Sequence, residues 1–235
     1  MRAYVINLDT ERDRWIDSIS QEEKLGIKIY RVSAINNQTF SHKVTKYLDN
    51  TIAAICESHL KAVRLFLKSD EDFCMILEDD FRLNRNYSRN IFFKISIEEF
   101  DFLQVGFLKM GLKQRFDVLY FNLLDLGLKA AFQVGRLLPH KYKDFILRKL
   151  FVREQEGVHK GLVLNDIRPG AHCYIVSRRF AQAMLEINRP PFLSVDNLYM
   201  SLGPLKTFRM ARFRRSLVGQ SDRMSSVVNR FKLTE

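Results

Sequence analysis

The sequence predicts an α/β fold, in which helices cover the faces of a sheet. Short apolar runs of strand character alternate along the chain with segments of helical periodicity. The 235 residues, 46% of them apolar, are enough to bury a sizeable core in one domain, which we expect to span 1–235. Two of the apolar runs end directly at acidic residues, and the carboxyl ends of strands are where such sheets bind ligands.

The amino-terminal part is predicted to contain two strands around one helix. Tyr4 to Leu8 is a short apolar run that ends at Asp9, the pattern of a strand buried on both faces. Residues 10–25 have the charge pattern of a helix. Ile27 to Ala34 is rich in β-branched residues and predicts a second strand.

The clearest helix of the sequence comes next. Residues 50–69 place apolar side chains at helical spacing along one face. Phe73 to Leu77 then forms a continuous apolar run of strand character that stops at the acidic triplet 78–80. Phe100 to Val105 predicts a fourth strand, which Gly106 ends.

The carboxyl-terminal part returns to alternating elements. Ala171 to Val176 predicts a strand, 178–188 a helix, and a further helix is expected from Asn197 after a proline-rich turn. We interpret the basic segment from Lys206 onward as a solvated tail, or alternatively as a segment that folds back over a bound ligand.

Residues of about 107–165 are predicted to be a helical insertion of basic character. From Lys129 to Arg153 there are seven Lys or Arg residues and one acid, Asp144, among bulky apolar side chains. This composition favours either an interfacial segment that contacts anionic lipids or an ordinary helical insertion packed on the sheet.

Composition limits the classes of function. The formal charge of +11 implies an anionic partner, such as nucleic acid, an acidic membrane surface or a phosphorylated small molecule. The three cysteines lie inside apolar runs, which is typical of reduced, buried thiols in a cytoplasmic protein. No apolar run approaches the roughly 18 residues of a membrane span, and the amino terminus lacks a signal-peptide pattern. We therefore expect a soluble protein, or one that sits on a membrane surface.

The triplet Glu78-Asp79-Asp80 is a candidate metal site. Adjacent carboxylates at the end of a hydrophobic strand repel one another, and a cation offsets that cost. Side chains alternate along a strand, so Glu78 and Asp80 are expected to face one way and Asp79 the other. Mg²⁺ and Mn²⁺ are commonly held by one or two carboxylates while phosphates complete the shell. The alternative is a solvated strand end paired with Arg82 and Arg85.

The chain resembles glycosyltransferase family 25, which contains bacterial lipooligosaccharide galactosyltransferases. The resemblance lies in VINLDTERDR, Ala34, the Glu-Ser-His of residues 57–59, MILEDDF, GAHCYIVSRRFAQAML and SVDNLYM. These segments occur in the family's order and cover most of the chain outside about 107–165. The resemblance implies a GT-A type, Rossmann-like mixed sheet with flanking helices, which binds a nucleotide-sugar beside an acidic, DxD-like motif.

The resemblance also implies roles for the three acids. Glu78 takes the place of the motif's first acid, near the ribose, and is a second candidate metal ligand. Asp80 takes the place of the last acid, on the metal that bridges the diphosphate. Asp79 lies nearer the sugar or a supporting donor and is a candidate catalytic acid. The motif begins with Glu rather than Asp, which leaves the division of labour within the triplet open.

Several residues of the matched segments are candidates for binding the nucleotide-sugar. They follow the first strand, lie in the helix 50–69, begin the strand at 171, or follow the basic stretch 209–215. Some of these residues have purely structural alternatives, since Asp9 can be a helix N-cap and the histidines can be core residues. The candidates are Asn7, Asp9, Arg12, His59, His172, Gln220 and Ser221, with Arg223 beside the last two.

Asp196 is the candidate general base. It lies at the start of a predicted helix, where a carboxylate is otherwise explained as an N-cap. In inverting GT-A transferases an acid at a comparable helix start takes the proton of the acceptor hydroxyl, which is general-base catalysis. Asp79 is the alternative base.

The sequence thus predicts a glycosyltransferase that uses Mn²⁺ or Mg²⁺ and a UDP-sugar, with UDP-galactose favoured. The acceptor implied by the family is a saccharide of lipooligosaccharide or lipopolysaccharide (LPS), and inversion of configuration is favoured. The expected location is the cytoplasm, with peripheral contact to the inner face of the membrane. The alternatives are a basic nucleic-acid-binding module and a catalytically inactive scaffold.

Overall fold

The computed structural model describes residues 1–38, 40, 48–85, 87–92, 95–108, 161–187 and 191–221 of the chain. The chain divides into two units, Met1–Phe107 with Glu156–Glu235, and Leu108–Gln155. All helices and strands named here belong to the first unit. The predicted insertion at about 107–165, with both of its interpretations, falls almost entirely outside the described residues.

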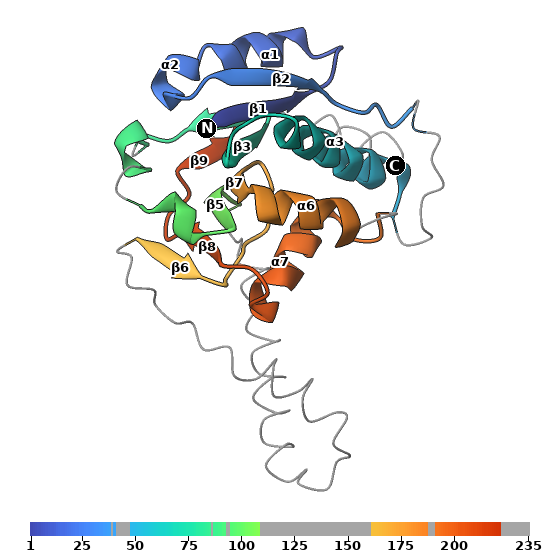
Figure 1. The fold of residues 1–235 in the computed structure, drawn as a ribbon. Coiled ribbons are helices and arrows are strands. Elements are labelled where there is room, and N and C mark those ends of the chain that lie inside the picture. The colour runs from blue at the N-terminus through green and yellow to red at the C-terminus, as the bar shows by residue number, and fades with distance from the viewer. Residues whose placement is uncertain are drawn as a thin grey trace, which may run out of the picture. The chain divides into compact units, whose positions relative to one another are not determined.

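Strands and helices alternate along the described chain (Figure 1). The first part contains β1 (Arg2–Asn7), α1 (Arg12–Ile19), α2 (Glu22–Leu25), β2 (Ile29–Ser33), α3 (Asn50–Leu67), β3 (Phe73–Glu78), β4 (Phe81–Leu83), the 3-10 turns η1 (Arg89–Ile91) and η2 (Ile97–Glu99), and β5 (Phe102–Gly106). The second part contains β6 (Leu162–Leu164), β7 (Cys173–Ser177), α6 (Arg178–Ile187), α7 (Val195–Leu205), β8 (Met210–Phe213) and β9 (Val218–Gln220).

The described strands form one mixed sheet in the order β2-β1-β3-β7-β5-β8-β6, with β9 pairing to β4 and β5. β1 lies parallel to both β2 and β3, whereas β7 runs antiparallel between β3 and β5. β5 is parallel to β8, and β6 is an antiparallel edge strand. The predicted α/β fold with a Rossmann-like mixed sheet and flanking helices is confirmed.

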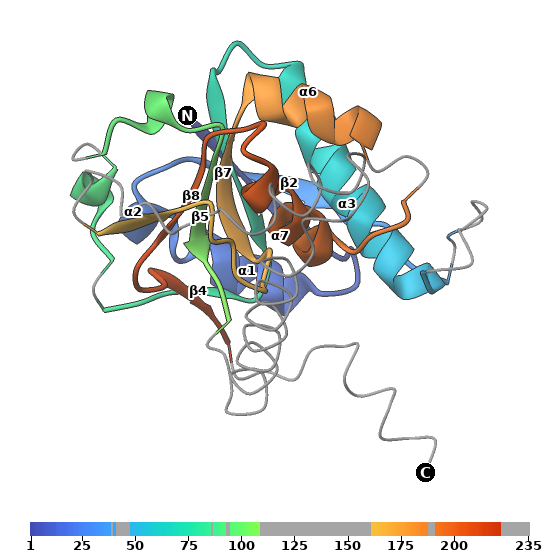
Figure 2. The ribbon, with the colours of Figure 1, turned by 90° about the horizontal axis from the view of Figure 1, so that it is seen from below.

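Helices cover one face of the sheet, and a shorter set of elements covers the other. α3, α6 and α7 pack on the first face, where Phe102, Tyr174 and Tyr199 form an aromatic cluster with ring centroids 4.8–5.4 Å apart. The second face packs against α2 and the segment from Tyr87 to Phe100. Figure 2 shows α3 and α6 on the opposite side of the sheet from α2. Burial on both faces explains why β3 and β7 are continuous apolar runs.

The register brings several strand ends to one edge of the sheet. Ile6 of β1 pairs with Glu78 of β3, so the carboxyl ends of these parallel strands lie side by side. The backbone N–H of Glu78 donates to the carbonyl of His172, which precedes β7, at 3.1 Å. Gln220 at the end of β9 pairs with Phe81, just beyond the triplet. This edge therefore gathers residues from four separate segments of the sequence.

The structure corrects two expectations about the elements. The helix expected over 10–25 is two helices, because α1 ends at Ile19 and α2 begins at Glu22 and is closed by Gly26 in a left-handed conformation (φ 71°). The basic segment expected as a solvated tail contains β8, whose four residues are all buried. Arg212 lies within that strand and pairs with Asp166, which makes its burial possible.

Cys56, Cys74 and Cys173 are free and buried, as predicted. Within the described part of the chain, no helix combines the length and hydropathy that a bilayer span needs.

Candidate active site

Glu78 lies at the centre of the strand-end cluster. Its carboxylate oxygen Oε1 is 3.4 Å from Nε2 of His59 on α3, and its side chain also accepts a hydrogen bond from Gln220. Burial acts to raise the pKa of Glu78, but the hydrogen bonds and the positive potential of His59 and His172 hold it below its ordinary value. Glu78 therefore remains ionised at neutral pH.

His59 is buried between Glu78 and the aromatic cluster. It is 1% exposed, and its Nδ1 lies 2.7 Å from the hydroxyl of Tyr174. The two rings stack at 18°. Tyr174 thus fixes the ring so that Nε2, which has no hydrogen-bond partner of good geometry, points at Glu78. His59 is a buried core residue, as one interpretation predicts, and it also faces the acidic cluster, whereas its role in binding a nucleotide-sugar stays a prediction.

Asp79 points away from Glu78, as the alternation along the strand predicts. Its Oδ2 accepts from Nδ2 of Asn7 at 2.7 Å, and its Oδ1 lies 3.3 Å from the guanidinium of Arg14. Burial raises the pKa of Asp79 above its ordinary value, although Asn7 and Arg14 act against this shift. Both carboxylate oxygens are thus engaged by groups of the protein, an arrangement that suits a structural anchor.

Asn7 uses its whole side chain to hold the surrounding segments. Besides the bond to Asp79, its Nδ2 donates to the carbonyl of Glu11 at 2.9 Å, and its Oδ1 accepts from Nε of Arg31 at 2.9 Å. The residue is 1% exposed. Its position at the end of β1 therefore joins β2, β3 and the start of α1.

Asp80 carries the strongest sign of an unfulfilled interaction. Its Oδ1 is buried and has no hydrogen-bond partner, while its backbone carbonyl accepts from the N–H of Ser221 at 2.7 Å. Burial, together with the negative charges of Glu78 and Asp79, raises the pKa of Asp80 to about 7. A buried carboxylate beside two others is stabilised in its ionised form by a cation.

His172 faces the same cluster from the start of β7. It is 1% exposed, its Nε2 lies 3.4 Å from the carbonyl of Val218, and its buried Nδ1 has no hydrogen-bond partner. Burial lowers the pKa of His172, and the charge of Glu78 partly opposes that shift. A Cβ on Gly106 would approach the His172 ring to 2.8 Å, so Gly106 makes room for the ring.

Asp196 lies in the first turn of α7, but it is not the helix cap. Ser194 is the N-cap, and its side chain accepts from the N–H of Asn197. The carboxylate of Asp196 instead accepts from the N–H of Gly170 at 3.0 Å. Burial raises the pKa of Asp196, and the charge of Glu78 raises it further. The N-cap alternative is therefore wrong, and the charge of Glu78 acts on the Asp196 carboxylate.

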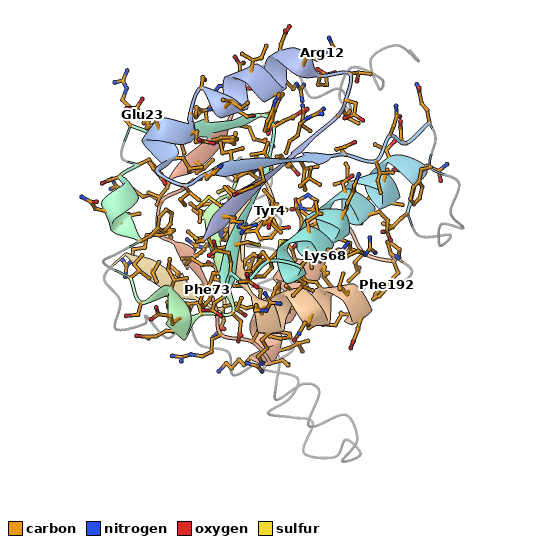
Figure 3. The ribbon with its side chains drawn as sticks, turned by 45° about the horizontal axis from the view of Figure 1, so that its top comes forward. Tyr4, Arg12, Glu23, Lys68, Phe73 and Phe192 are labelled. Carbon is orange, nitrogen blue, oxygen red and sulfur yellow. The ribbon has the colours of Figure 1, made fainter. Side chains whose placement is uncertain are left out.

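Asp9 and Arg12 lie further out. Asp9 accepts from the hydroxyl of Ser33 at 2.8 Å and pairs with Arg31 at 2.8 Å, and these contacts hold its pKa below the ordinary value. The expected N-cap role of Asp9 is wrong, because Glu11 occupies the cap position of α1. Arg12 is exposed on the outer side of α1 (Figure 3).

The carboxyl-terminal candidates reach the cluster through β9. Gln220 is bonded to Glu78, and Ser221 is bonded to Asp80 through its backbone. The segment that follows the basic stretch therefore folds back onto the acidic triplet. Arg223 lies outside the described residues.

The cluster fits a divalent cation of the kind that phosphates complete. Asp80 offers an unpartnered buried oxygen, and Glu78 is ionised beside it. Among the described residues, no group of three or more His, Cys, Asp or Glu side chains forms a protein-only metal cage. One or two carboxylates at a strand end match the sites in which a substrate diphosphate supplies further ligands.

Two contributors to the site were missed from the sequence. Tyr174, which orients His59, lies two residues after His172, and period-two alternation in the predicted strand places both on one face. Arg31, which binds Asn7 and Asp9, lies in the middle of the second strand, and no local sequence pattern marks it as a site residue. The first could have been found from the alternation, whereas the second depends on the pairing of β1 with β2.

In α/β sheets, ligands commonly bind at the carboxyl ends of the strands, where this chain gathers its acids, and comparison with known proteins identifies the family. The model of glycosyltransferase family 25 (LPS biosynthesis protein) matches residues 1–199. The chain therefore belongs to glycosyltransferase family 25, and it is a glycosyltransferase of the LPS-biosynthesis class. The comparison with curated proteins gave no significant match.

Solved structures show distant likeness. A197 from STIV has a TM-score of 0.45 and 16% identity, covering 93% of this chain and 83% of its own. A glycosyltransferase involved in glycosylation of the major capsid of PBCV-1 has a TM-score of 0.46 and 8% identity, with 100% of both chains covered. The galactosyltransferase LgtC, in complex with donor and acceptor sugar analogs, has a TM-score of 0.44 and 10% identity, covering 94% and 87%. At these scores the likenesses carry no argument about the site.

The raised pKa of Asp80 predicts a pH dependence of stability in the absence of metal. An unfolded Asp has a pKa of about 3.9, so between about pH 4 and pH 7 the folded state binds more protons than the unfolded state. The free energy of unfolding should therefore fall as the pH rises through this window. Replacement Asp80→Asn should remove that part of the fall and stabilise the protein at pH 8 by on the order of 2 kcal/mol, with almost no effect at pH 4.

Urea unfolding at pH 4, 6 and 8 in the presence of a chelator measures this difference. Asp70→Asn, at an exposed position of the turn after α3, is the matched control and should leave the pH dependence unchanged. If the free energy of unfolding depends on pH identically in wild type and Asp80→Asn, the raised pKa of Asp80 is contradicted.

Proposed function

We propose that the protein is a metal-dependent glycosyltransferase that moves a hexose, with galactose favoured, from a UDP-sugar to a saccharide acceptor of lipooligosaccharide or LPS. The observation that carries this proposal is the unpartnered buried oxygen of Asp80 beside ionised Glu78, in a chain of this family. Family membership favours the enzyme over the nucleic-acid-binding alternative, which gives no reason for gathering acids at a strand end.

The donor would bind at the carboxyl ends of β1 and β3. Asp80 and Glu78 would hold Mn²⁺ or Mg²⁺, and the ion would offset charge that develops on the departing UDP. Asp9 is already oriented by Ser33 and Arg31 and is 68% exposed at its side chain, so it can accept from the uracil or ribose. Arg12 is exposed nearby on α1 and can reach a phosphate.

The histidines and the β9 segment would complete the donor site. Nε2 of His59 faces Glu78 at 3.4 Å, Nδ1 of His172 is buried without a hydrogen-bond partner, and both histidines interact electrostatically with Glu78. We assign them to the nucleotide-sugar. Gln220 and Ser221 tie the end of β9 to Glu78 and Asp80, where they can cover the diphosphate.

Asp196 is the proposed general base. The residue is partly buried, its carboxylate accepts from the N–H of Gly170, and its raised pKa suits proton transfer. It would accept the proton of the acceptor hydroxyl as that oxygen attacks the anomeric carbon opposite UDP, which inverts the configuration. Asp79 and Asn7 receive a positioning role in this scheme, because their polar atoms already bind Arg14, Arg31 and each other.

The proposed location is the cytoplasmic side of the membrane. The formal charge of +11 would favour peripheral contact with an anionic surface, on which a lipid-linked acceptor is found. An acidic site can bind an anionic diphosphate in this basic protein, because the cation would screen the carboxylates from the diphosphate.

Donor binding is expected to require both the metal and Asp80. Calorimetric titration with a panel of UDP-sugars should detect binding with Mn²⁺ and little without it. Asp80→Ala should weaken the Mn²⁺-dependent binding by about 100-fold, because it removes a direct ligand. Asp70→Ala is the control carboxylate and should bind as wild type does. Binding that is indifferent to Mn²⁺ and to Asp80 would refute the metal role, and binding without any UDP release would favour an inactive scaffold.

Loss of the base is expected to affect turnover rather than donor binding. Asp196→Asn should lower kcat for transfer from the UDP-sugar by about 10²- to 10⁴-fold, while the Kd for the donor changes little. Asn197→Ala, the exposed neighbour on the same helix turn, serves as the control. A kcat for Asp196→Asn within a few-fold of wild type would transfer the base role to another acid.

A further inference from the structure

Gln104 is a polar residue in the middle of an otherwise apolar buried strand. It lies in β5 between Leu103 and Val105, and it is 1% exposed. Its strand position pairs with Tyr174 of β7, so the two side chains lie on the same face of the sheet. A buried amide at such a position costs free energy unless all of its polar atoms are bonded.

The side-chain amide of Gln104 makes its hydrogen bonds to one loop. Its Nε2 donates to the carbonyl of Arg168 at 2.7 Å and to the carbonyl of Gly170 at 3.1 Å. Its Oε1 accepts from the backbone N–H of Arg168 at 2.9 Å. The Gln104 amide thus bonds the backbone of Arg168 and Gly170 as a neighbouring strand would, and it fixes the loop in one conformation.

The same loop orients the proposed base. The N–H of Gly170 donates to Oδ2 of Asp196 at 3.0 Å. Gly170 therefore contacts both residues: its carbonyl accepts from Gln104, and its N–H donates to Asp196. Gly170 has φ 105°, a conformation open to glycine, which lets its carbonyl and its N–H serve the two partners. The next residues of the chain lead directly to His172.

Other contacts hold the far end of this loop but do not reach Gly170. The N–H of Asn165 donates to the carbonyl of Met210, and Asp166 pairs with Arg212 of β8. A Cβ on Gly203 of α7 would come within 2.8 Å of the Asn165 carbonyl, so helix and loop are in close contact there. At the Gly170 end, Ala171 is buried in the apolar core and its N–H also bonds Asp196, and Gln104 adds the side-chain hydrogen bonds to Arg168 and Gly170.

We propose that Gln104 is a positioning residue for catalysis: through Arg168 and Gly170 it sets the place of the Asp196 carboxylate relative to the acceptor hydroxyl. This inference rests on the proposed function, in which Asp196 is the base. Gln104 does not touch the donor, so its loss alters the geometry of proton transfer and leaves the binding of the UDP-sugar intact.

The test compares kcat with donor affinity in two variants. Gln104→Met keeps the length of the side chain and removes its hydrogen bonds, whereas Gln104→Glu keeps an acceptor for the Arg168 N–H and sets a carboxylate against two carbonyls. Both should lower the rate of UDP release from UDP-galactose, measured with Mn²⁺ and purified lipooligosaccharide, by about 10- to 100-fold. The Kd for UDP-galactose with Mn²⁺ should stay within about twofold of wild type.

A purely structural role is separated by a control and by a double-mutant cycle. Ser177→Ala removes a buried hydroxyl of β7 that bonds Asp101 and the N–H of Phe180, away from the loop. It should lower Tm without changing kcat. In an Asp196→Asn background, measured in single turnover, Gln104→Met should cause less than about a twofold further loss, because both changes act on one step.

The outcomes distinguish this inference from the proposed function. Gln104 does not act through Asp196 if Gln104→Met or Gln104→Glu folds and keeps kcat within about twofold of wild type. The same conclusion follows if the loss of rate caused by the Gln104 change is equally large in the Asp196→Asn background. If Asp196→Asn itself retains the wild-type kcat, the proposed base is wrong and the inference falls with it. A parallel loss of kcat and of donor affinity would assign Gln104 to the fold alone.

Discussion

The hydrogen bond from Asn7 to Asp79 is the interaction on which the rest of the site depends. β1 and β3 are parallel neighbours, so their carboxyl ends meet, and the amide of Asn7 captures the middle acid of the triplet there. Asp79 is thereby turned toward Arg14 and α1, which leaves Glu78 facing α3 and His59. A hydrogen bond to a buried charged group contributes about 1.5–3 kcal/mol, enough to fix the triplet in one orientation.

That orientation concentrates negative charge on one side of the strand end. Glu78 acts electrostatically on both Asp80 and Asp196, whose pKa values are raised by burial and by the charge of Glu78. His59 acts on the charge of both Glu78 and Asp196, whereas no histidine acts on Asp80 to a comparable extent. One carboxylate of this cluster is paired and its neighbour has an unpartnered oxygen, which costs free energy in the isolated protein. The cation proposed above, with its phosphate ligands, would relieve that cost.

The sequence predicted the parts of the molecule that local pattern determines. The long apolar face of α3 and the uninterrupted runs of β3 and β7 were evident, because burial on one or both faces leaves a periodic signal. The short strands β4 and β6, with three residues each, were missed, since so few residues carry no period. β8 was hidden by its arginine, whose burial depends on Asp166, a partner 46 positions away in the sequence.

The candidate site follows the same division. Alternation predicted that Glu78 and Asp79 diverge, and the family resemblance pointed to Asp80 and Asp196. The sequence could not show that Ser194 rather than Asp196 caps α7, because either residue type serves as an N-cap. Nor could it show that Gly170 binds Asp196 and that Gln104 binds Gly170, since these contacts join residues 26 and 66 positions apart.

The central claim is that the end of β3 presents Asp80, with Glu78, to a divalent cation that a nucleoside diphosphate completes. Anomalous diffraction from crystals grown with Mn²⁺ and UDP tests it most directly. The account predicts a manganese peak within about 2.2 Å of an Asp80 carboxylate oxygen, with diphosphate oxygens in the same coordination shell. Manganese bound elsewhere, or UDP bound at this strand end with no metal on Asp80, would contradict it.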